Sequence, residues 1–210
     1  MNDTRIRRIP CGLIGTNSYI VSRHNESDAV VIDPADAEAI IGVLEETGLY
    51  CTAILLTHGH FDHISGLNGL RQKYYCPVYV GTDDADMLVD PTINGSLMML
   101  KAAIRQSEAD KTVNDGDIIE VAGMEFRVIG CPGHTEGGVS FYLNDALFSG
   151  DSLFCRGVGR TDLPGGDTDK LFSTVLKLYK LPAETVVYPG HGESTTIGDE
   201  AAKNPFIRRN

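Results

Sequence analysis

The sequence has no tryptophan, five scattered cysteines and no long apolar run, and the last two features each exclude a class of protein. The five cysteines are scattered singly without a C-x-x-C pair, which indicates reduced thiols rather than a disulfide framework. No apolar stretch approaches the roughly 18 to 20 residues that a membrane-spanning helix needs. The N-terminal segment MNDTRIRRIP has no apolar core behind its charges, so we expect no secretory signal and a cytoplasmic protein.

Basic residues are also scarce. The 210 residues contain 18 Lys and Arg against 29 Asp and Glu, for a net charge of −11, and no Lys/Arg-rich run. A protein that grips a phosphate backbone needs a clustered basic face, so nucleic acid is not an expected partner. The chain shows no internal repeat or linker, and its length predicts one domain over residues 1–210.

Short β-branched runs and helical patterns are mixed along the chain. Strands are predicted at 18–22, 29–33, 51–57, 76–80, 124–130, 139–143, 146–150 and 185–189. Helical spacing is found at 35–49, 64–74, about 85–106 and 169–181. The first two strands flank the polar segment RHNESD and are expected to pair as an antiparallel hairpin. The pattern predicts an α/β or α+β fold with at least two sheets.

Five of the six histidines directly follow predicted strands, together with two aspartates. They lie in the segments THGHFDHISG, CPGHTEGG, FSGD and PGHGEST, and the seven side chains are His58, His60, Asp62, His63, His134, Asp151 and His191. The carboxyl ends of strands are where loops converge and ligands bind. Imidazole and carboxylate are the donors that Zn²⁺ and related ions prefer, and a set without thiolate fits a catalytic site better than a closed structural one.

The spacing within residues 58–63 predicts two metal positions. Residues two apart in extended backbone point the same way, so His58 and His60 can hold one ion. Asp62 and His63 lie just beyond the bend and face a second. Gly59 and Gly66 are expected to relieve crowding where the backbone passes close to the metals.

The motifs resemble a known superfamily. THGHFDHISG resembles the T-H-x-H-x-D-H signature of the metallo-β-lactamase-fold hydrolases, and CPGHT, FSGD and PGHG match the remaining motifs in order. The likeness is strongest to short glyoxalase II-like (hydroxyacylglutathione hydrolase-like) proteins, through LFSGDSLFCRGVGRTDLPGGD and VVYPGHGESTTIGDEAAKNPF. This resemblance implies a four-layer αββα sandwich, two mixed sheets flanked by helices, with a dinuclear site at its rim.

The resemblance also implies roles for individual residues. His58, His60 and His134 would hold the first metal, Asp62, His63 and His191 the second, and Asp151 would bridge both. Zn²⁺ is the expected metal, with Fe and Mn²⁺ as alternatives. Asp62 and Asp151 would complete a catalytic centre around a metal-bridging hydroxide. Arg160, in GVGRTD, stands where these proteins carry a basic residue near the glutathione carboxylate.

The expected reaction is hydrolysis of a thioester such as S-lactoylglutathione by attack of the bridging hydroxide. The expected partner is therefore a small anionic thioester, with no membrane, and the protein is expected to be a monomer or weak homo-oligomer. Only 19 residues follow His191, so we expect the C-terminal helical glutathione-binding domain of full-length glyoxalase II to be missing. The identity of the acyl group therefore stays open.

Three other functions remain alternatives. A persulfide dioxygenase-like oxidoreductase would use a single iron held by His58, His134 and Asp151, but the complete second set of ligands favours a hydrolase. A metal-dependent nuclease is disfavoured by the net charge. A non-catalytic metal-binding module would be expected to have lost ligands. A flavodiiron role is disfavoured because His60 stands where those relatives carry Glu.

Asp33 either orients a ligand histidine or opens a turn before Pro34.

Overall fold

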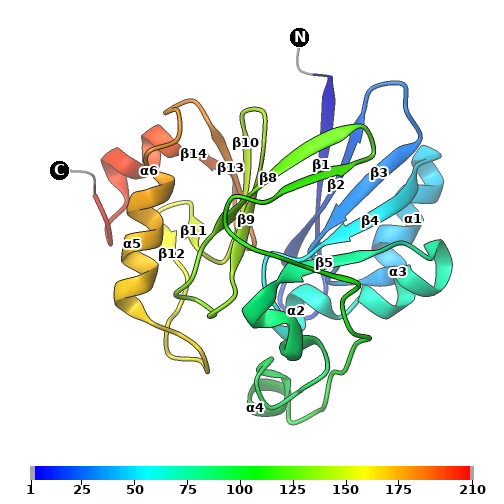
Figure 1. Ribbon diagram of the computed structural model, residues 1–210, viewed down its shortest axis with the longest axis horizontal. Coiled ribbons are helices and arrows are strands. Elements are labelled where there is room, and N and C mark those ends of the chain that lie inside the picture. Colours follow the sequence, from blue (N-terminus) through cyan, green and yellow to red (C-terminus); the bar gives the residue numbers. More distant parts are fainter. Residues whose placement is uncertain (1–2, 209–210) are drawn as a thin grey trace.

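Two six-stranded sheets stack face to face in the computed structural model, which describes residues 3–208 (Figure 1). The first sheet has the order β1 (Thr4–Cys11), β2 (Thr16–Arg23), β3 (Asp28–Ile32), β4 (Tyr50–Leu55), β5 (Val78–Gly81) and β6 (Lys111–Val113). The second has the order β14 (Thr195–Thr196), β13 (Val186–Pro189), β10 (Ala146–Gly150), β9 (Val139–Leu143), β8 (Met124–Gly130) and β7 (Ile118–Val121).

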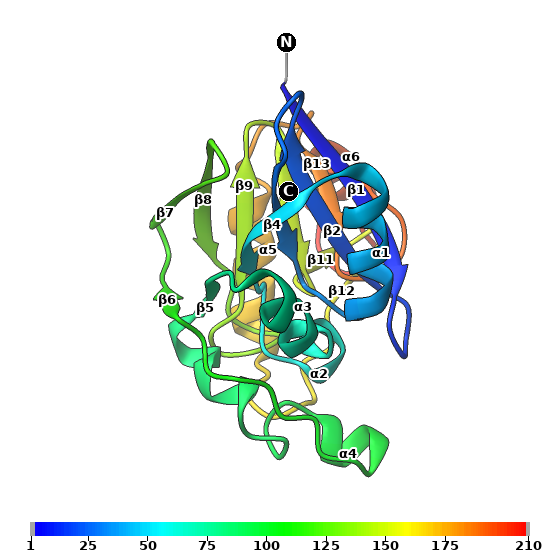
Figure 2. The same ribbon diagram turned by 90° about the vertical axis from the view of Figure 1, so that its right-hand side faces the viewer.

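Helices cover the outer faces of both sheets, which completes the predicted αββα sandwich (Figures 1 and 2). The first sheet carries α1 (Ala37–Thr47) and α3 (Leu67–Tyr74), and the second carries α5 (Thr168–Leu178) and α6 (Ile197–Lys203). Two short helices, α2 (Phe61–Ile64) and α4 (Ser96–Leu100), lie at one end of the sandwich. None of the helices within residues 3–208 is long and apolar enough to cross a membrane.

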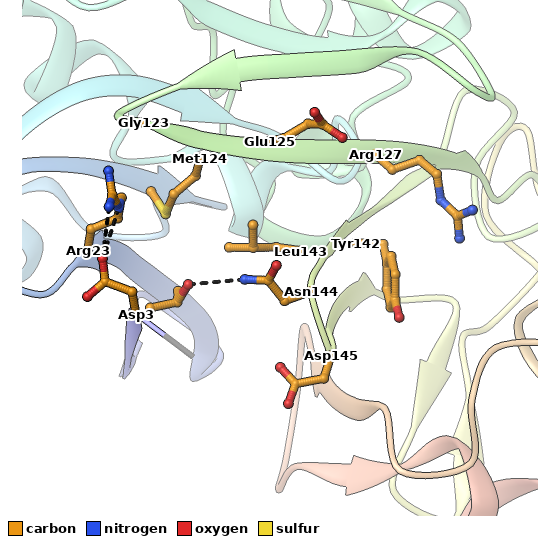
Figure 3. Close-up of a pocket in the computed structure, with 11 residues that line it drawn as sticks. Asp3, Arg23, Gly123, Met124, Glu125, Arg127, Tyr142, Leu143, Asn144 and Asp145 are labelled. Atoms are coloured by element: carbon orange, nitrogen blue, oxygen red, sulfur yellow. Dashed lines mark hydrogen bonds and ion pairs between the residues drawn. The ribbon is translucent and has the colours of Figure 1, made fainter. Parts of the chain in front are cut away.

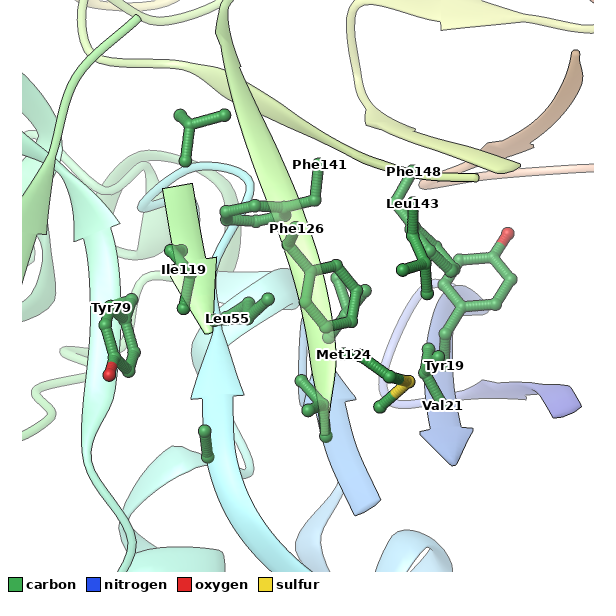
Figure 4. Close-up of a cluster of buried hydrophobic side chains, with 14 of the residues drawn as sticks. Tyr19, Val21, Leu55, Tyr79, Ile119, Met124, Phe126, Phe141, Leu143 and Phe148 are labelled. Atoms are coloured by element: carbon green, nitrogen blue, oxygen red, sulfur yellow. The ribbon is translucent and has the colours of Figure 1, made fainter. Parts of the chain in front are cut away.

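The main core lies between the two sheets (Figure 4). Alternate residues of each strand point inward, so the second sheet contributes Phe126, Phe141 and Phe148 while the first contributes Tyr19 and Leu55. All five are buried. The outer faces pack separately against their helices, and this double burial explains why the central strands are apolar almost throughout.

Strand direction brings the ends of several strands to one rim. β3, β4, β5 and β6 are mutually parallel neighbours, and β10 is parallel to β13. The predicted hairpin is confirmed, because β2 and β3 pair antiparallel with Tyr19 opposite Ile32. The carboxyl ends of β4, β10 and β13 therefore reach the same end of the sandwich, where α2 lies.

Helix α1 shows why its sequence starts and stops where it does. The side chain of Asp36 accepts a hydrogen bond from the Ala39 amide and caps the first turn. Gly48 adopts a left-handed conformation with φ of 66° and ends the helix, as its position after the last apolar residue predicts.

The prediction of a helix over about 85–106 is wrong. The chain instead forms a 3₁₀ helix, η1 (Thr82–Leu88), and then only the short α4, which Lys101 ends in a left-handed conformation. The Asn94 amide donates to the Met87 and Ile104 carbonyls, and these side-chain bonds stabilise the irregular path.

Several short or exposed elements were not predicted from the sequence. Strand β1 alternates exposed and half-buried residues around its three arginines, so its apolar signal is weak. The unpredicted elements also include β6, β7, α6, β14 and the small hairpin of β11 (Leu153–Phe154) and β12 (Gly157–Val158).

Candidate metal centre

The structure brings all seven predicted side chains together at the rim. His58 and His60 lie in the loop after β4, and Asp62 and His63 lie on α2. The other three follow β8, β10 and β13 and are His134, Asp151 and His191. Five of the seven are buried, and Asp151 and His191 are partly exposed.

Three imidazoles form the first group. The candidate ligand atoms of His58, His60 and His134 lie within 4.8 Å of one another. Nδ1 of His60 lies 2.9 Å from Nε2 of His134. Within residues 3–208, Nε2 of His58 and Nε2 of His60 are buried without a hydrogen-bond partner. A buried polar nitrogen without a partner is costly, so these two atoms fit a ligand that accepts their lone pairs.

The second group contains a carboxylate and two imidazoles. Oδ2 of Asp62 lies 3.2 Å from Nε2 of His63 and 3.3 Å from Nε2 of His191. Asp151 lies between the two groups. Its Oδ1 is 3.4 Å from Nε2 of His63, and its Oδ2 is 3.6 Å from Nε2 of His134 and 3.6 Å from Nε2 of His191. One carboxylate therefore faces both groups.

The pKa values of four of these side chains favour the protonation states that bind a metal ion. Burial, reinforced by the neighbouring histidines, lowers the pKa of His58 well below its usual value and that of His60 to about 3, so both rings are neutral near pH 7. Burial is the largest single influence on the pKa values of Asp62 and Asp151 and would raise them, but the charges and hydrogen bonds of His63 and the neighbouring histidines together outweigh it and lower both. The carboxylates are therefore ionised, as metal ligands must be.

The residues fit two divalent cations. The first group offers three neutral imidazoles, the second offers two imidazoles and a carboxylate, and Asp151 is shared. Oδ1 of Asp151 and Nε2 of His63 are further buried atoms without a hydrogen-bond partner in the described part of the chain. A site with mixed His and Asp donors and no thiolate is of the open, catalytic kind.

Of the two roles predicted for Asp33, its contacts support the orientation of a ligand histidine. Its Oδ2 accepts a hydrogen bond from the Thr57 hydroxyl at 2.6 Å and lies 2.9 Å from Nδ1 of His63. Its Oδ1 accepts from the Thr57 amide at 2.7 Å. The side chain is only 2% exposed. Asp33 therefore holds the His63 ring and the start of the ligand loop in place.

Asp84 is a positioning residue that the sequence did not indicate. Its carboxylate accepts hydrogen bonds from the Gly59 amide at 3.1 Å, the Thr135 hydroxyl at 2.8 Å and the Gly137 amide at 2.7 Å. It thus joins the loop of His58 and His60 to the loop of His134. Burial raises the pKa of Asp84, although its three donors work in the opposite direction. Asp84 lies in the segment where our helix prediction is wrong, and no motif marks it.

A second unpredicted contact reaches Asp62. The Thr16 hydroxyl, at the start of β2, donates to Oδ2 of Asp62 at 2.7 Å, and both side chains are buried. Thr16 is far from every motif in sequence, so only the fold reveals the contact.

Glycines allow the loops to approach closely. A Cβ on Gly190 would lie 2.1 Å from Oδ1 of Asp151 and 2.7 Å from Cε1 of His63. A Cβ on Gly59 would lie 2.4 Å from Cβ of Met87, so this glycine permits packing against η1. The expectation for Gly66 is wrong, because it packs against the backbone of Ala37 in α1 and not beside the metal centre.

A cleft of about 410 Å³ opens onto the centre. Its polar floor includes His60, Asp62, His134, Asp151 and His191, and its walls are mostly apolar: Ile14, Phe61, Met99, Phe154, Val158 and Leu163. Arg160 also lines the cleft. Its guanidinium donates two hydrogen bonds to Asp162, at 2.7 and 2.8 Å, and its carbonyl oxygen lies 2.7 Å from Nδ1 of His134.

A larger hollow of about 810 Å³ lies at the other end of the sandwich, where β1 begins and β9 turns into β10 (Figure 3). Its lining includes Arg23, which is paired with Asp3, and Tyr142, which lies under Arg127. It contains none of the predicted metal-binding residues. Cavity size alone therefore does not locate the chemistry in this fold.

Comparison with known proteins agrees with the fold and shows the family. Residues 11–191 match the metallo-beta-lactamase superfamily. The chain is 37% identical over 205 residues to "Probable metallo-hydrolase YqgX" of Bacillus subtilis, covering 96% of each chain. It is 34% identical over 188 residues to "Hydroxyacylglutathione hydrolase GloC" of Haemophilus influenzae, covering 87% of this chain and 89% of that protein.

Solved structures are similar as well. The crystal structure of BLEG-1 B3 metallo-beta-lactamase has a TM-score of 0.94 and 40% identity, covering 97% of this chain and 99% of that one. The structure of TTHA1623 in a di-iron-bound form has a TM-score of 0.82 and 36% identity, covering 96% of this chain and 100% of that one.

Proposed function

The chain belongs to the metallo-beta-lactamase superfamily and carries the His/Asp metal site of a metal-dependent hydrolase, and from that premise we propose that it hydrolyses thioesters. S-lactoylglutathione is the substrate on which we base the test. The observation that carries the proposal is the position of Asp151, whose two oxygens face the two groups of ligands at one rim.

We propose zinc as the resident metal, held by His58, His60 and His134 at one position and by Asp62, His63 and His191 at the other, with Asp151 shared. Two divalent ions bound there would lower the pKa of a water enough to supply a nucleophile at neutral pH and would offset negative charge on the carbonyl oxygen. Asp33 and Asp84 act through other residues by fixing the ligand loops.

The cleft favours a substrate with an apolar part and an anionic part. Ile14 from the β1–β2 turn and Met99 from α4 offer apolar surface on the wall beside the centre. Two of the seven proposed ligands, Asp62 and Asp151, are carboxylates, so two divalent cations held by these ligands would leave the group with a net positive charge that attracts anions, although the net charge of the chain is −11. Arg160 adds a cation at the wall of the cleft.

Among the comparisons, the similarity to GloC supports glutathione thioesters as the substrate class. The di-iron form of TTHA1623 makes iron the alternative metal. The experiment must therefore measure the metal on the same sample that is assayed.

The test is a steady-state assay with zinc-loaded protein whose metal content has been measured. Release of glutathione from S-lactoylglutathione is followed with a thiol reagent, beside free zinc at the same concentration and beside a His134→Ala variant. We expect turnover by the wild type only. A fully loaded, folded wild type that cleaves no faster than free zinc would refute the proposal.

A second candidate is hydrolysis of β-lactams, because the chain is 40% identical to BLEG-1 over nearly its whole length. The same centre would then attack a strained cyclic amide whose carboxylate lies towards Arg160. A chromogenic cephalosporin added to the same zinc-loaded sample distinguishes the two. Cleavage of the cephalosporin without cleavage of S-lactoylglutathione would favour this second candidate.

A further inference from the structure

Two cysteine side chains lie against each other in the core between the first sheet and its helices. Cys51 is on β4, Cys76 lies just before β5, and their Sγ atoms are 3.6 Å apart. Both thiols belong to the cluster under α1 and α3, away from the metal centre. We propose that Cys51 and Cys76 form a reversible intramolecular disulfide when the protein meets a peroxide or a low-molecular-weight disulfide.

The surrounding backbone fits such a bond. β4 and β5 are parallel neighbours with Ile54 opposite Val78, so the segments that carry the two cysteines run side by side. A disulfide needs an S–S distance of about 2.05 Å, so the two sulfurs, which are 3.6 Å apart, must move closer for the bond to form. The neighbouring tyrosines already join the segments, because the Tyr50 hydroxyl donates to the Tyr74 carbonyl at 3.1 Å and their rings meet edge to face.

The two sulfurs have different reactivities. The hydrogen bond between the thiols lowers the pKa of Cys76 and raises that of Cys51. Burial works against the first shift and adds to the second. Cys76 retains 5% of its surface exposed, whereas Cys51 is fully buried. Cys76 is therefore the sulfur that attacks the oxidant, and Cys51 is the sulfur that completes the bond.

With hydrogen peroxide the reaction balances in two steps. The Cys76 thiolate attacks one peroxide oxygen, the O–O bond breaks, and hydroxide leaves a sulfenic acid on Cys76. The Cys51 sulfur then attacks the Cys76 sulfur, the S–O bond breaks, and water leaves. The two thiols lose two electrons and two protons, and one peroxide becomes two waters. Oxidised glutathione gives the same product by two exchanges that release two molecules of reduced glutathione.

The bond would enclose the whole of the metal-binding segment THGHFDHISG. The cysteines are 25 positions apart, and His58, His60, Asp62 and His63 lie between them. A cross-link over a loop of this length restricts the unfolded chain and is expected to raise the melting temperature by roughly 5 to 10 °C. Oxidation would thus stabilise the loop that carries four of the seven metal-site residues.

The other cysteines provide an internal control. Cys155 is exposed, so it is the thiol most accessible to any oxidant. Cys11 and Cys131 lie near the hydroxyls of Ser18 and Ser140, at 3.3 and 3.0 Å. A reaction governed by accessibility alone would modify Cys155 and leave Cys51 and Cys76 reduced.

The test equilibrates the metal-loaded protein in buffers of graded oxidised to reduced glutathione, traps free thiols with N-ethylmaleimide under denaturing conditions and maps peptides without reduction. We expect a peptide linked through Cys51 and Cys76, reversal by dithiothreitol, and the rise in melting temperature in wild type and Cys155→Ser. Cys76→Ala should show no rise. Recovery of Cys51 and Cys76 as trapped free thiols in a folded protein whose Cys155 is oxidised would overturn the proposal, and this wild-type result decides even where Cys76→Ala does not fold.

Discussion

Oδ2 of Asp33 lies 2.9 Å from Nδ1 of His63, and this contact leaves Nε2 of the same ring facing Asp62 and Asp151. The ring is fully buried, so its orientation depends on this partner. The same carboxylate accepts a hydrogen bond from the Thr57 hydroxyl, and this bond connects the end of β3 to the ligand loop. A side chain outside every ligand motif therefore decides which nitrogen of His63 is available to a metal.

Replacing Asp33 should weaken metal binding more than it weakens the fold. Asp33→Asn keeps the size of the side chain but removes the charge that orients His63. We expect about a 10- to 100-fold loss of affinity at the second metal position. Chelator competition followed by metal analysis measures it, with the exposed Asp28→Asn at the start of β3 as the matched control. Equal affinity in wild type and Asp33→Asn would contradict the assigned role.

Asp84 predicts a pH dependence of stability. Burial raises its pKa in the folded state above the ordinary 3.8. The folded protein therefore holds this proton more tightly than the unfolded chain, so the contribution is fully present below about pH 3.8 and is lost as pH rises through the raised value.

The comparison with Asp84→Asn isolates this effect, because the variant cannot titrate. Urea unfolding at several pH values should show the stability of the wild type, relative to Asp84→Asn, falling as pH rises from 4 and then levelling off. The exposed neighbour variant Asp83→Asn should follow the wild type. Stability of the wild type that rises with pH relative to Asp84→Asn would show that the pKa is lowered.

Gly190 and Gly42 offer a matched pair of alanine substitutions. In Gly190→Ala the new methyl carbon would meet Oδ1 of Asp151 at 2.1 Å, so the carboxylate must move and metal binding should fall. In Gly42→Ala, within α1, the methyl group meets nothing within 4 Å, and we expect a gain of about 0.5 to 1 kcal/mol in stability. Bound metal per protein and urea unfolding measure both. Full metal content in Gly190→Ala would mean that Asp151 is not fixed where the structure has it.

Arg160 should affect the binding of charged substrates only. Its side chain is half exposed and already paired with Asp162, so its contact with a substrate anion is worth little. We expect Arg160→Ala to raise KM for S-lactoylglutathione about two- to fivefold with kcat unchanged. A neutral thioester serves as the control and should keep its KM. An equal rise in KM for both substrates would show that Arg160 shapes the cleft rather than attracting the anion.

Local patterns predicted a mixed fold with at least two sheets and the clustering of seven side chains, whereas the αββα sandwich was implied by the resemblance of the motifs to the metallo-β-lactamase-fold hydrolases. Each ligand follows a short apolar run, and the ends of such strands meet at one rim whatever the details of the loops. Asp33 also follows a strand, but an aspartate before proline has a second ordinary use in a turn, so its role needed the contact with His63.

Asp84 and Thr16 could not have been found in this way. Asp84 is separated by 25 positions from Gly59 and by 51 from Thr135, and only folding makes them partners. The same holds for the segment around Asn94, where side-chain hydrogen bonds replace the helix that the apolar spacing favoured. Local patterns report burial and turns, whereas these residues act through contacts between distant segments.

The most direct test of the account is a metal titration of the metal-free protein with S-lactoylglutathione hydrolysis measured at each addition. Because the structure presents two groups of ligands that share Asp151, we expect the rate to rise with bound zinc and to level off at about two ions per chain. No hydrolysis at full loading, or a rate that already levels off at one ion per chain, would contradict a dinuclear thioester hydrolase.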